Sequence, residues 1–203
     1  SSMFLINGGN TIPKDEGADV WGVEHDSNSI PIYSQAKAIP YLNLYWGSTS
    51  DTGCDSAAIE VIVVTRNNIS GLIKSYRYVY DNNDCLGRRA ENNFTLADSG
   101  SFPIAGGNFK YRTPDNNLAN DISGTDISDV VLIRVIPIYK DSKIAVLACD
   151  HNQTAGNCTF LPLQGYVISS TGVSGSATKK IVTFEGFPQT YLPYLSYGLF
   201  VAN

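Results

Sequence analysis

The sequence predicts a mainly β protein, an antiparallel β-sandwich-like domain with long loops. Its 203 residues include 12 Tyr, 8 Phe and many Val, Ile and Thr, the residue types that favour pleated, half-buried strands. Gly, Asn, Asp and Ser recur at short intervals, as turn residues do. Long helical periodicity is almost absent, and only the segment 33–42 has room for one turn before Pro40. We expect one domain over 1–203 or, as the alternative, two small β lobes divided near 114–128.

Ten segments have the length and residue types of strands and are separated by turn signals. They read DVWGV, SIPIYS, YLNLYW, AIEVIVVTR, LIKSYRYVY, NFKYRT, DVVLIRVIPIY, KIAVLAC, GYVISS and KKIVTF. In 129–139 both alternating sets are apolar except at Arg134, so we expect a central strand covered on both faces, whose ladder ends or bulges at Pro137. In IKSYRYVY the alternation places three tyrosines on one face, which favours packing in the core over use as a contact surface.

The charge balance excludes two classes of partner. A charged fraction of 16% and a formal net charge of −5 leave no basic surface for nucleic-acid phosphates or for an anionic membrane. No apolar run approaches the roughly 20 residues that span a bilayer. We therefore expect no nucleic-acid partner and no membrane contact in this fragment, and we expect any targeting signal to lie upstream of Ser1.

The four cysteines predict disulfides in an exported protein. They are Cys54, Cys85, Cys149 and Cys158. No C-x-x-C pair occurs and the chain holds only two histidines, which disfavours a zinc site. Of the three possible connectivities we favour the sequential one, Cys54 with Cys85 and Cys149 with Cys158, because Cys149 ends an apolar strand and Cys158 begins CTFLP across a short loop.

The stretch STGVSGS, residues 170–176, comes close to two catalytic motifs and fits neither. The nucleophile elbow G-x-S-x-G needs glycine where Ser176 stands, and it must lie between a strand and a helix, whereas a strand-like segment follows here. A phosphate-binding loop needs lysine directly after glycine, and Lys179 follows a threonine. A six-residue hairpin connection, with Gly172 and Gly175 at positive φ, explains the stretch without special chemistry.

No other set of residues predicts catalysis. A serine or cysteine hydrolase needs a histidine base, but His25 and His151 lie in separate polar loops. The acidic residues mostly stand beside Asn, Ser and Gly, as turn residues do, and no pair stands out for glycosidase chemistry. We predict a protein that is not an enzyme and has no catalytic residue.

Calcium is the one cofactor that the sequence leaves open. The loop 81–87 is rich in oxygen ligands, but Cys85 and Asn92 stand where an EF-hand loop needs an oxygen ligand and a bidentate glutamate. Asp121, Asp126 and Asp129 form a weak candidate, for which ordinary turn roles are the favoured interpretation. We expect no cofactor.

The C-terminal third contains an apolar strand with Arg and Pro, an LP-x-QGY hairpin and a closing segment rich in Pro, Leu and Tyr. With these elements it resembles the soluble head of prepilin-type, type IV pilin-like proteins of small surface-dwelling bacteria, and LNLYWGSTSDTGCDSAAIEVIVV adds a weaker likeness. Most of 1–40 and 86–125 is not covered. The matching residues are Arg134, Pro137, Tyr139, Leu161, Pro162, Gln164, Gly165, Tyr166, Ser170, Thr171, Gly172, Gly175, Ile181, Leu192, Pro193, Tyr197, Leu199 and Phe200.

This resemblance implies a non-catalytic, extracellular subunit of a pilus, a minor or tip-associated pilin that serves assembly or attachment. Its partners would be other pilin subunits and a host-cell or glycan surface, and its location the cell surface or the pilus. Proteins of this group carry an N-terminal apolar helix, which the sequence lacks and which we expect upstream of Ser1. The alternative is a secreted lectin-like β-sandwich in which Trp21, Trp46 or exposed tyrosines stack on sugars, although Trp46 fits the core better.

Overall fold

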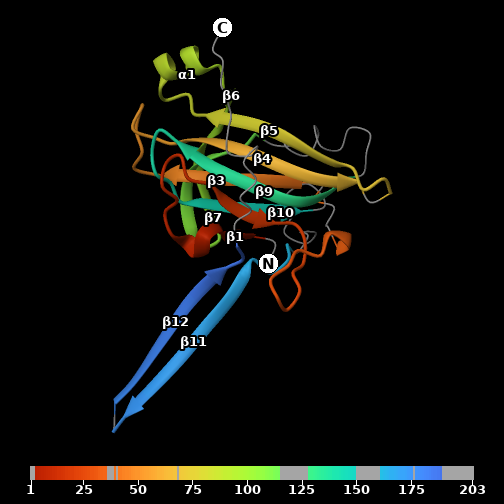
Figure 1. Ribbon diagram of the computed structural model, residues 1–203. Helices are drawn as coiled ribbons and strands as arrows, with labels where there is room; N and C mark the ends of the chain where they lie inside the picture. The colour runs from red at the N-terminus through yellow and green to blue at the C-terminus, as the bar shows by residue number, and fades with distance from the viewer. Residues whose placement is uncertain are drawn as a thin grey trace.

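The computed structural model describes residues 3–35, 39, 41–67, 69–114, 128–149, 161–175 and 177–188. Within them the protein is mainly β, as predicted, and two five-stranded sheets pack on each other as a sandwich (Figure 1). The strands are β1 (Met3–Leu5), β2 (Ala18–Trp21), β3 (Tyr41–Ser48), β4 (Ala58–Asn67), β5 (Ile73–Asp81), β6 (Thr95–Leu96), β7 (Asp98–Ile104), β8 (Gly107–Arg112), β9 (Ser128–Ile138), β10 (Ile144–Cys149), β11 (Gly165–Ser174) and β12 (Ala177–Gly186). The described helical elements are α1 (Leu86–Asn92) and the 3-10 turns η1 (Ile6–Gly9) and η2 (Tyr33–Gln35).

The first sheet has the order β1-β10-β3-β8-β7 and the second the order β2-β9-β4-β5-β6. All pairings are antiparallel except that of β5 with the short β6. Each sheet combines strands from before and after the segment 114–128. The alternative division into two lobes stays a prediction, because 115–127 lie outside the described residues.

The main core lies between the two sheets and is built by alternate residues of each strand. Trp46 is fully buried there and donates its indole N–H to the carbonyl of Ala57 at 3.0 Å, so this large side chain leaves no polar atom unsatisfied. Tyr80 is also buried in it, and the other two tyrosines of β5 pack against it, which confirms the predicted inward aromatic face. The core includes Val20, Leu42, Leu44, Ile59, Val61, Val63, Ile133, Val135 and Val146.

The second sheet is buried on its outer face as well. Residues of β2, β4 and β9 outside the main core form a second cluster with Phe187, and this cluster includes Trp21, Ile62 and Leu132. The prediction of a central, doubly covered strand at β9 is confirmed, since β2 and β4 pair with its two edges. Its ladder with β4 ends at Ile138, one residue after Pro137.

The sequence misses or misplaces several elements. The predicted strand 29–34 is wrong, because its backbone closes a turn on Asp26, whose carboxylate accepts hydrogen bonds from two backbone N–H groups, and then enters η2. The η2 turn does occupy the one site where a helical turn was expected. Helix α1 and the strands β6 and β7 were not predicted, because their residues are mostly polar and show no clear period.

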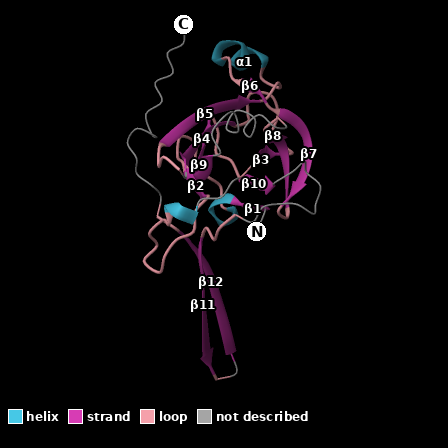
Figure 2. Ribbon diagram, turned by 90° about the vertical axis from the view of Figure 1, so that its right-hand side faces the viewer, coloured by secondary structure: helices cyan, strands magenta, loops and turns pink. Residues whose placement is uncertain are grey.

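The hairpin β11–β12 belongs to neither sheet of the sandwich. Both views show two long paired strands that project from one end of the body, opposite the end that carries α1 (Figures 1 and 2). The two strands pair with each other over ten residue pairs and with no other described strand. This projecting hairpin is the most distinctive feature of the fold.

Candidate functional site

The projecting hairpin exposes nearly every one of its residues. All described residues of β11 and β12 are exposed except Gly165, which is half-buried. Several are large and apolar, with exposed fractions of 50 to 70% for Val167, Ile168, Val173, Ile181 and Val182. An isolated two-stranded hairpin is only marginally stable in water. A hairpin of this length with so many exposed apolar side chains is therefore typical of a contact element.

Apolar side chains lie on both faces of this hairpin. Directly opposite residues share a face, so Ser170 and Ile181 lie on one face, while Val167 and Phe184 lie on the other. Neither face resembles the solvent side of an antiparallel sheet, which is normally polar. The hairpin therefore presents two contact surfaces and two unpaired strand edges, among the residues that the structure describes.

Gln164 fixes the base of the hairpin to the body. Its side-chain amide pairs with the backbone of Trp21 in the manner of a neighbouring strand: the Trp21 N–H donates to Oε1 at 2.7 Å, and Nε2 donates to the Trp21 carbonyl at 2.9 Å. Nε2 also donates to the Pro162 carbonyl at 2.8 Å, and the Phe187 N–H donates to the Gln164 carbonyl at 3.0 Å. At Gly165 a Cβ would lie 2.1 Å from the Glu185 carbonyl oxygen, so only glycine fits this exit point.

The hydrogen bonds of Gln164 form a clamp, and four aromatic side chains pack around it. We call these side chains, Trp21, His25, Tyr166 and Phe187, the aromatic seat. The ring of His25 stacks on Phe187 at 3.8 Å between centroids and meets the edge of Trp21 at 4.7 Å. Tyr166, the second residue of β11, packs edge-on against Phe187 at 5.2 Å. The seat therefore joins residues on both sides of the hairpin to the outer face of the second sheet.

Burial in the seat lowers the pKa of His25 below its ordinary value of 6.5. The backbone of Val23 and the carboxylates of Glu24 and Asp26 act in the opposite direction, but burial is the larger effect. Neither ring nitrogen makes a hydrogen bond of good geometry with a described residue. Burial therefore favours the neutral form of the His25 ring, whose described contacts are aromatic packing against Trp21 and Phe187.

A small cavity of about 260 Å³ lies between the hairpin base and the β1–η1 segment. Its lining is mostly apolar and includes Phe4, Ile6, Phe184 and Phe187. The carboxylate of Asp19, which also reaches it, is already bound by Arg134 through two hydrogen bonds of 2.7 and 2.8 Å. Among the residues that the structure describes, the cavity thus offers apolar surface and a carboxylate that is already paired.

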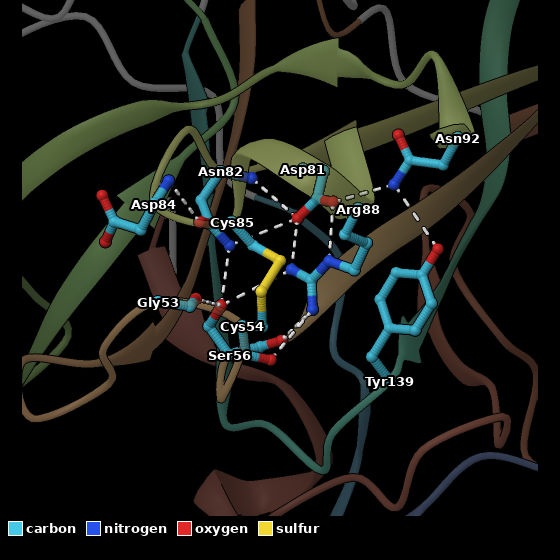
Figure 3. The surroundings of a disulfide bond; sticks show 10 residues. All are labelled: Gly53, Cys54, Ser56, Asp81, Asn82, Asp84, Cys85, Arg88, Asn92 and Tyr139. Atoms are coloured by element: carbon cyan, nitrogen blue, oxygen red, sulfur yellow. Dashed lines mark hydrogen bonds and ion pairs between the residues drawn. A yellow bond between two sulfur atoms is a disulfide. The ribbon is translucent and has the colours of Figure 1, made fainter. Parts of the chain in front are cut away.

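At the far end of the body, a disulfide and a buried ion pair tie three segments together (Figure 3). Cys54 and Cys85 form a disulfide, as predicted. Beside it, Arg88 of α1 donates to both carboxylate oxygens of Asp81, which is 0% exposed, and to the carbonyls of Cys54 and Ser56. These bonds pair the charge of Asp81, so the loop 81–87 has a structural role. We call this group of contacts the disulfide cluster.

Two more side chains belong to the disulfide cluster. Asn92 donates to Asp81 Oδ2 at 2.8 Å, and the guanidinium of Arg88 lies 4.3 Å from the ring centre of Tyr139 (Figure 3). In the same loop, the hydrogen bond from Lys110 lowers the pKa of Asp84, which also accepts from the hydroxyl of Tyr111 at 3.0 Å. Helix α1 is thereby fixed to Asp81 of β5 and to Tyr139 just after β9, and the loop before α1 is fixed to β8.

The remaining predicted site residues divide into those with a described place and those without one. Arg134 lies opposite Asp19 in the β2–β9 ladder and forms a nearly buried ion pair with it. Gly175 has φ of +59°, as predicted, but Gly172 lies inside β11 opposite Lys179 and does not have positive φ. The predicted six-residue connection is therefore wrong: the β-branched residues of 171–178 extend the ladder until Ser174 pairs with Ala177.

Several predictions fall outside the described residues. They concern the tail residues Leu192, Pro193, Tyr197 and Phe200, the base candidate His151, the cysteine Cys158 with its proposed partner Cys149, whose side chain is not described, and the calcium candidates Asp121, Asp126 and Asp129, of which only the last has a described backbone. Among the described residues, no three His, Cys, Asp or Glu side chains gather closely enough to hold a metal ion.

The aromatic residues that could stack on sugars lie at different depths in the described part of the chain. Trp46 is 0% exposed, which confirms its predicted core position, and Trp21 is 5% exposed in the second cluster. The exposed tyrosines, Tyr33, Tyr139 and Tyr166, lie on separate elements. They form no shared platform of the kind that binds a glycan ring.

The clamp residues were missed by sequence reasoning as functional residues. Gln164 and Gly165 belong to the LP-x-QGY motif, yet nothing in the residue pattern reveals that a side-chain amide pairs with a strand 143 positions away. Phe187 carries no signal of its own, because a lone aromatic residue after a strand has many structural roles.

Comparisons with known proteins add no relative: no model of a protein family, no curated protein and no solved structure matches this chain. No helix in the described ranges is long and apolar enough to span a lipid bilayer.

Proposed function

We propose that this chain is a non-catalytic, extracellular structural subunit, the soluble head of a type IV pilin-like protein that serves assembly or attachment. The body supplies a disulfide-tied scaffold, and the hairpin β11–β12 supplies the surface that binds neighbouring subunits.

The observation that carries the proposal is the contrast in burial at the hairpin base. Gln164 and the aromatic seat fix the hairpin firmly where it leaves the body, while the strands beyond them are exposed on both faces. Ordering an exposed, apolar hairpin costs conformational entropy that its own contacts do not return. A binding partner that covers it provides the compensating burial.

The motif shared with pilin-like proteins supports the same proposal. In this motif Gln164 holds the hairpin base by hydrogen bonds, Gly165 leaves room for the carbonyl of Glu185, and Tyr166 packs against Phe187. Two further shared residues stabilise the body. Arg134 forms the buried ion pair of the second sheet, and the ring of Tyr139 contacts the guanidinium of Arg88 in α1. The motif is thus explained by the positioning of the hairpin and by the scaffold, without any catalytic group.

The test is made in the cell that produces the chain. Residues 168–183 are replaced by Asn-Gly, which joins the paired residues Val167 and Phe184 by a tight turn and preserves the seat. We expect immunogold labelling to find the full chain in surface filaments and to find the shortened chain exported but outside them. The control Ile69→Ser, which changes a 98% exposed apolar side chain of the body, should label filaments normally.

Two results would contradict the proposal. One is a full chain that never reaches the cell surface. The other is a shortened chain that enters filaments as well as the full chain does.

A further inference from the structure

Strand β12 has one edge with which no described strand pairs, and an unusual distribution of charge. The hairpin carries three charged residues, all of them on β12: Lys179 and Lys180 near the turn, and Glu185 near the body. Lysines commonly protect an edge strand from pairing, but an acid on the same strand supplies a partner for them. Lys179 and Glu185 stand three residues before and three residues after Val182.

This symmetry matters because an antiparallel pair of identical strands is related by a two-fold axis. If the axis passes through Val182, residue pairs whose numbers sum to 364 face each other, and they lie on the same face of the sheet. Lys179 then faces Glu185 of the second copy, and this ion pair occurs twice. On the opposite face Val182 meets its own copy, and Lys180 lies opposite Phe184, an arrangement suited to a cation–π contact.

The same register leaves room for the two bodies. Thr178 of one copy faces Gly186 of the other, so the end of each hairpin just reaches the base of its partner. The bodies therefore lie at opposite ends of the shared sheet. Each copy gains backbone hydrogen bonds along a free edge, together with burial of Ile181 and Val182, which are 54% and 57% exposed in the single chain.

We propose that two copies of this chain associate through β12, which pairs antiparallel with the β12 of the second copy about Val182 to form a four-stranded sheet. This inference deepens the proposed function by naming a second copy of the chain as the partner of the hairpin. It differs from pairing through β11, which carries no charge and specifies no register.

The first experiment measures the dimer dissociation constant of the purified full chain by sedimentation over a concentration series. Lys179→Glu places like charges opposite each other at both ends of the paired strands, and we expect it to raise the dissociation constant about tenfold. Lys179→Glu combined with Glu185→Lys restores opposite charges and should return it to the starting value. Lys143→Glu, at an exposed site on the body, makes the same change in net charge and should have no effect.

A second experiment tests the register directly. The position on the axis is the one that faces itself, so Val182→Cys should form an interchain disulfide in a mild oxidising buffer, since facing Cα atoms lie about 4.5 to 5.5 Å apart. Lys180→Cys, two positions away, should not. A chain that stays monomeric, a charge reversal that the double variant does not rescue, or efficient cross-linking at residue 180 instead of residue 182 would each overturn the proposal.

Failure here is distinguishable from failure of the proposed function. If the purified chain is monomeric but hairpin shortening still excludes it from filaments, the pilin-like role stands and the partner of the hairpin is another subunit. If the shortened chain enters filaments normally, the role itself fails.

Discussion

Strands β4 and β12 have the same length and share runs of β-branched residues, yet their surroundings are opposite. In β4 the first eight residues are buried, with β5 and β9 on its edges and an apolar cluster on each face. In β12 every described residue is exposed, and β11 is the one described strand that pairs with it. Residue type made both into strands, but burial was decided by what covers them.

The body and the hairpin are therefore stabilised in different ways. The body is held by its core, by the Cys54–Cys85 disulfide and by buried ion pairs. The hairpin depends on a narrow attachment at Gln164 and the aromatic seat. Changes in the body should therefore lower the global free energy of unfolding, whereas changes at the attachment should release the hairpin alone.

The largest effect is expected from breaking the buried ion pair in the second sheet. Arg134→Met leaves the 2% exposed carboxylate of Asp19 without its guanidinium, which should cost about 3–5 kcal/mol of unfolding free energy. Urea denaturation followed by circular dichroism measures this loss. The double variant Arg134→Met/Asp19→Leu removes both charges and should recover much of it; a double variant no more stable than the single one would argue against an uncompensated charge.

The disulfide should have the next largest effect. Cys54→Ser/Cys85→Ser opens a link across 31 residues and should lower the free energy of unfolding by about 2–4 kcal/mol. The Arg88–Asp81 pair remains in this variant, so α1 should keep its helical signal before the main transition. If the double serine variant were as stable as the parent, the disulfide would not constrain the unfolded chain.

A smaller, local effect is expected at the clamp. Gln164→Ala removes both hydrogen bonds to the Trp21 backbone, and the penalty of about 1–3 kcal/mol should appear as faster hydrogen exchange in 165–186. Exchange in β3 and β4 should stay unchanged. Leu163→Ala, a change at a neighbouring residue that is 70% exposed, serves as the matched control and should leave the hairpin amides as they are.

The smallest effect is a pH dependence of the seat. Because burial depresses the pKa of His25 in the folded state, its contribution to stability is complete above its ordinary pKa of 6.5 and is lost as the pH falls through the lower folded value. Acidification should therefore loosen the stack of His25 on Phe187, which Trp21 fluorescence reports. His25→Phe should remove this pH dependence; if the fluorescence change persisted in that variant, another group would be responsible.

Sequence reasoning predicted the parts of this fold that follow from residue period and failed where tertiary contacts decide. The alternation around Arg134 and the tyrosines of β5 gave a central strand and an inward face, and both are confirmed. The pairing of Cys54 with Cys85 was also predicted, because the short loop between Cys149 and Cys158 favoured the sequential connectivity. In contrast, α1 is fixed by the buried carboxylate of Asp81, and no local pattern announces such a contact.

The hairpin shows the same limit at the site itself. Its strands and the turn at Gly175 were visible in the sequence, but its length was underestimated, because Gly172 reads as a turn residue unless Lys179 is known to lie opposite. Its projection away from the body was not predictable. An amphipathic pattern normally reports a core of the same chain, but here the described residues of both strands beyond Gly165 stay exposed, and the described contacts with the body lie at the hairpin base.

The measurement that tests this division of the molecule most directly compares the urea unfolding of the full chain with that of the chain in which Asn-Gly replaces 168–183, both below the concentration of any dimer. We predict one cooperative transition in each, with free energies of unfolding that agree to within about 1 kcal/mol. A shortened chain that loses cooperative unfolding, or that is less stable by several kcal/mol, would show that the hairpin belongs to the core of its own chain, and would contradict its role as a contact element.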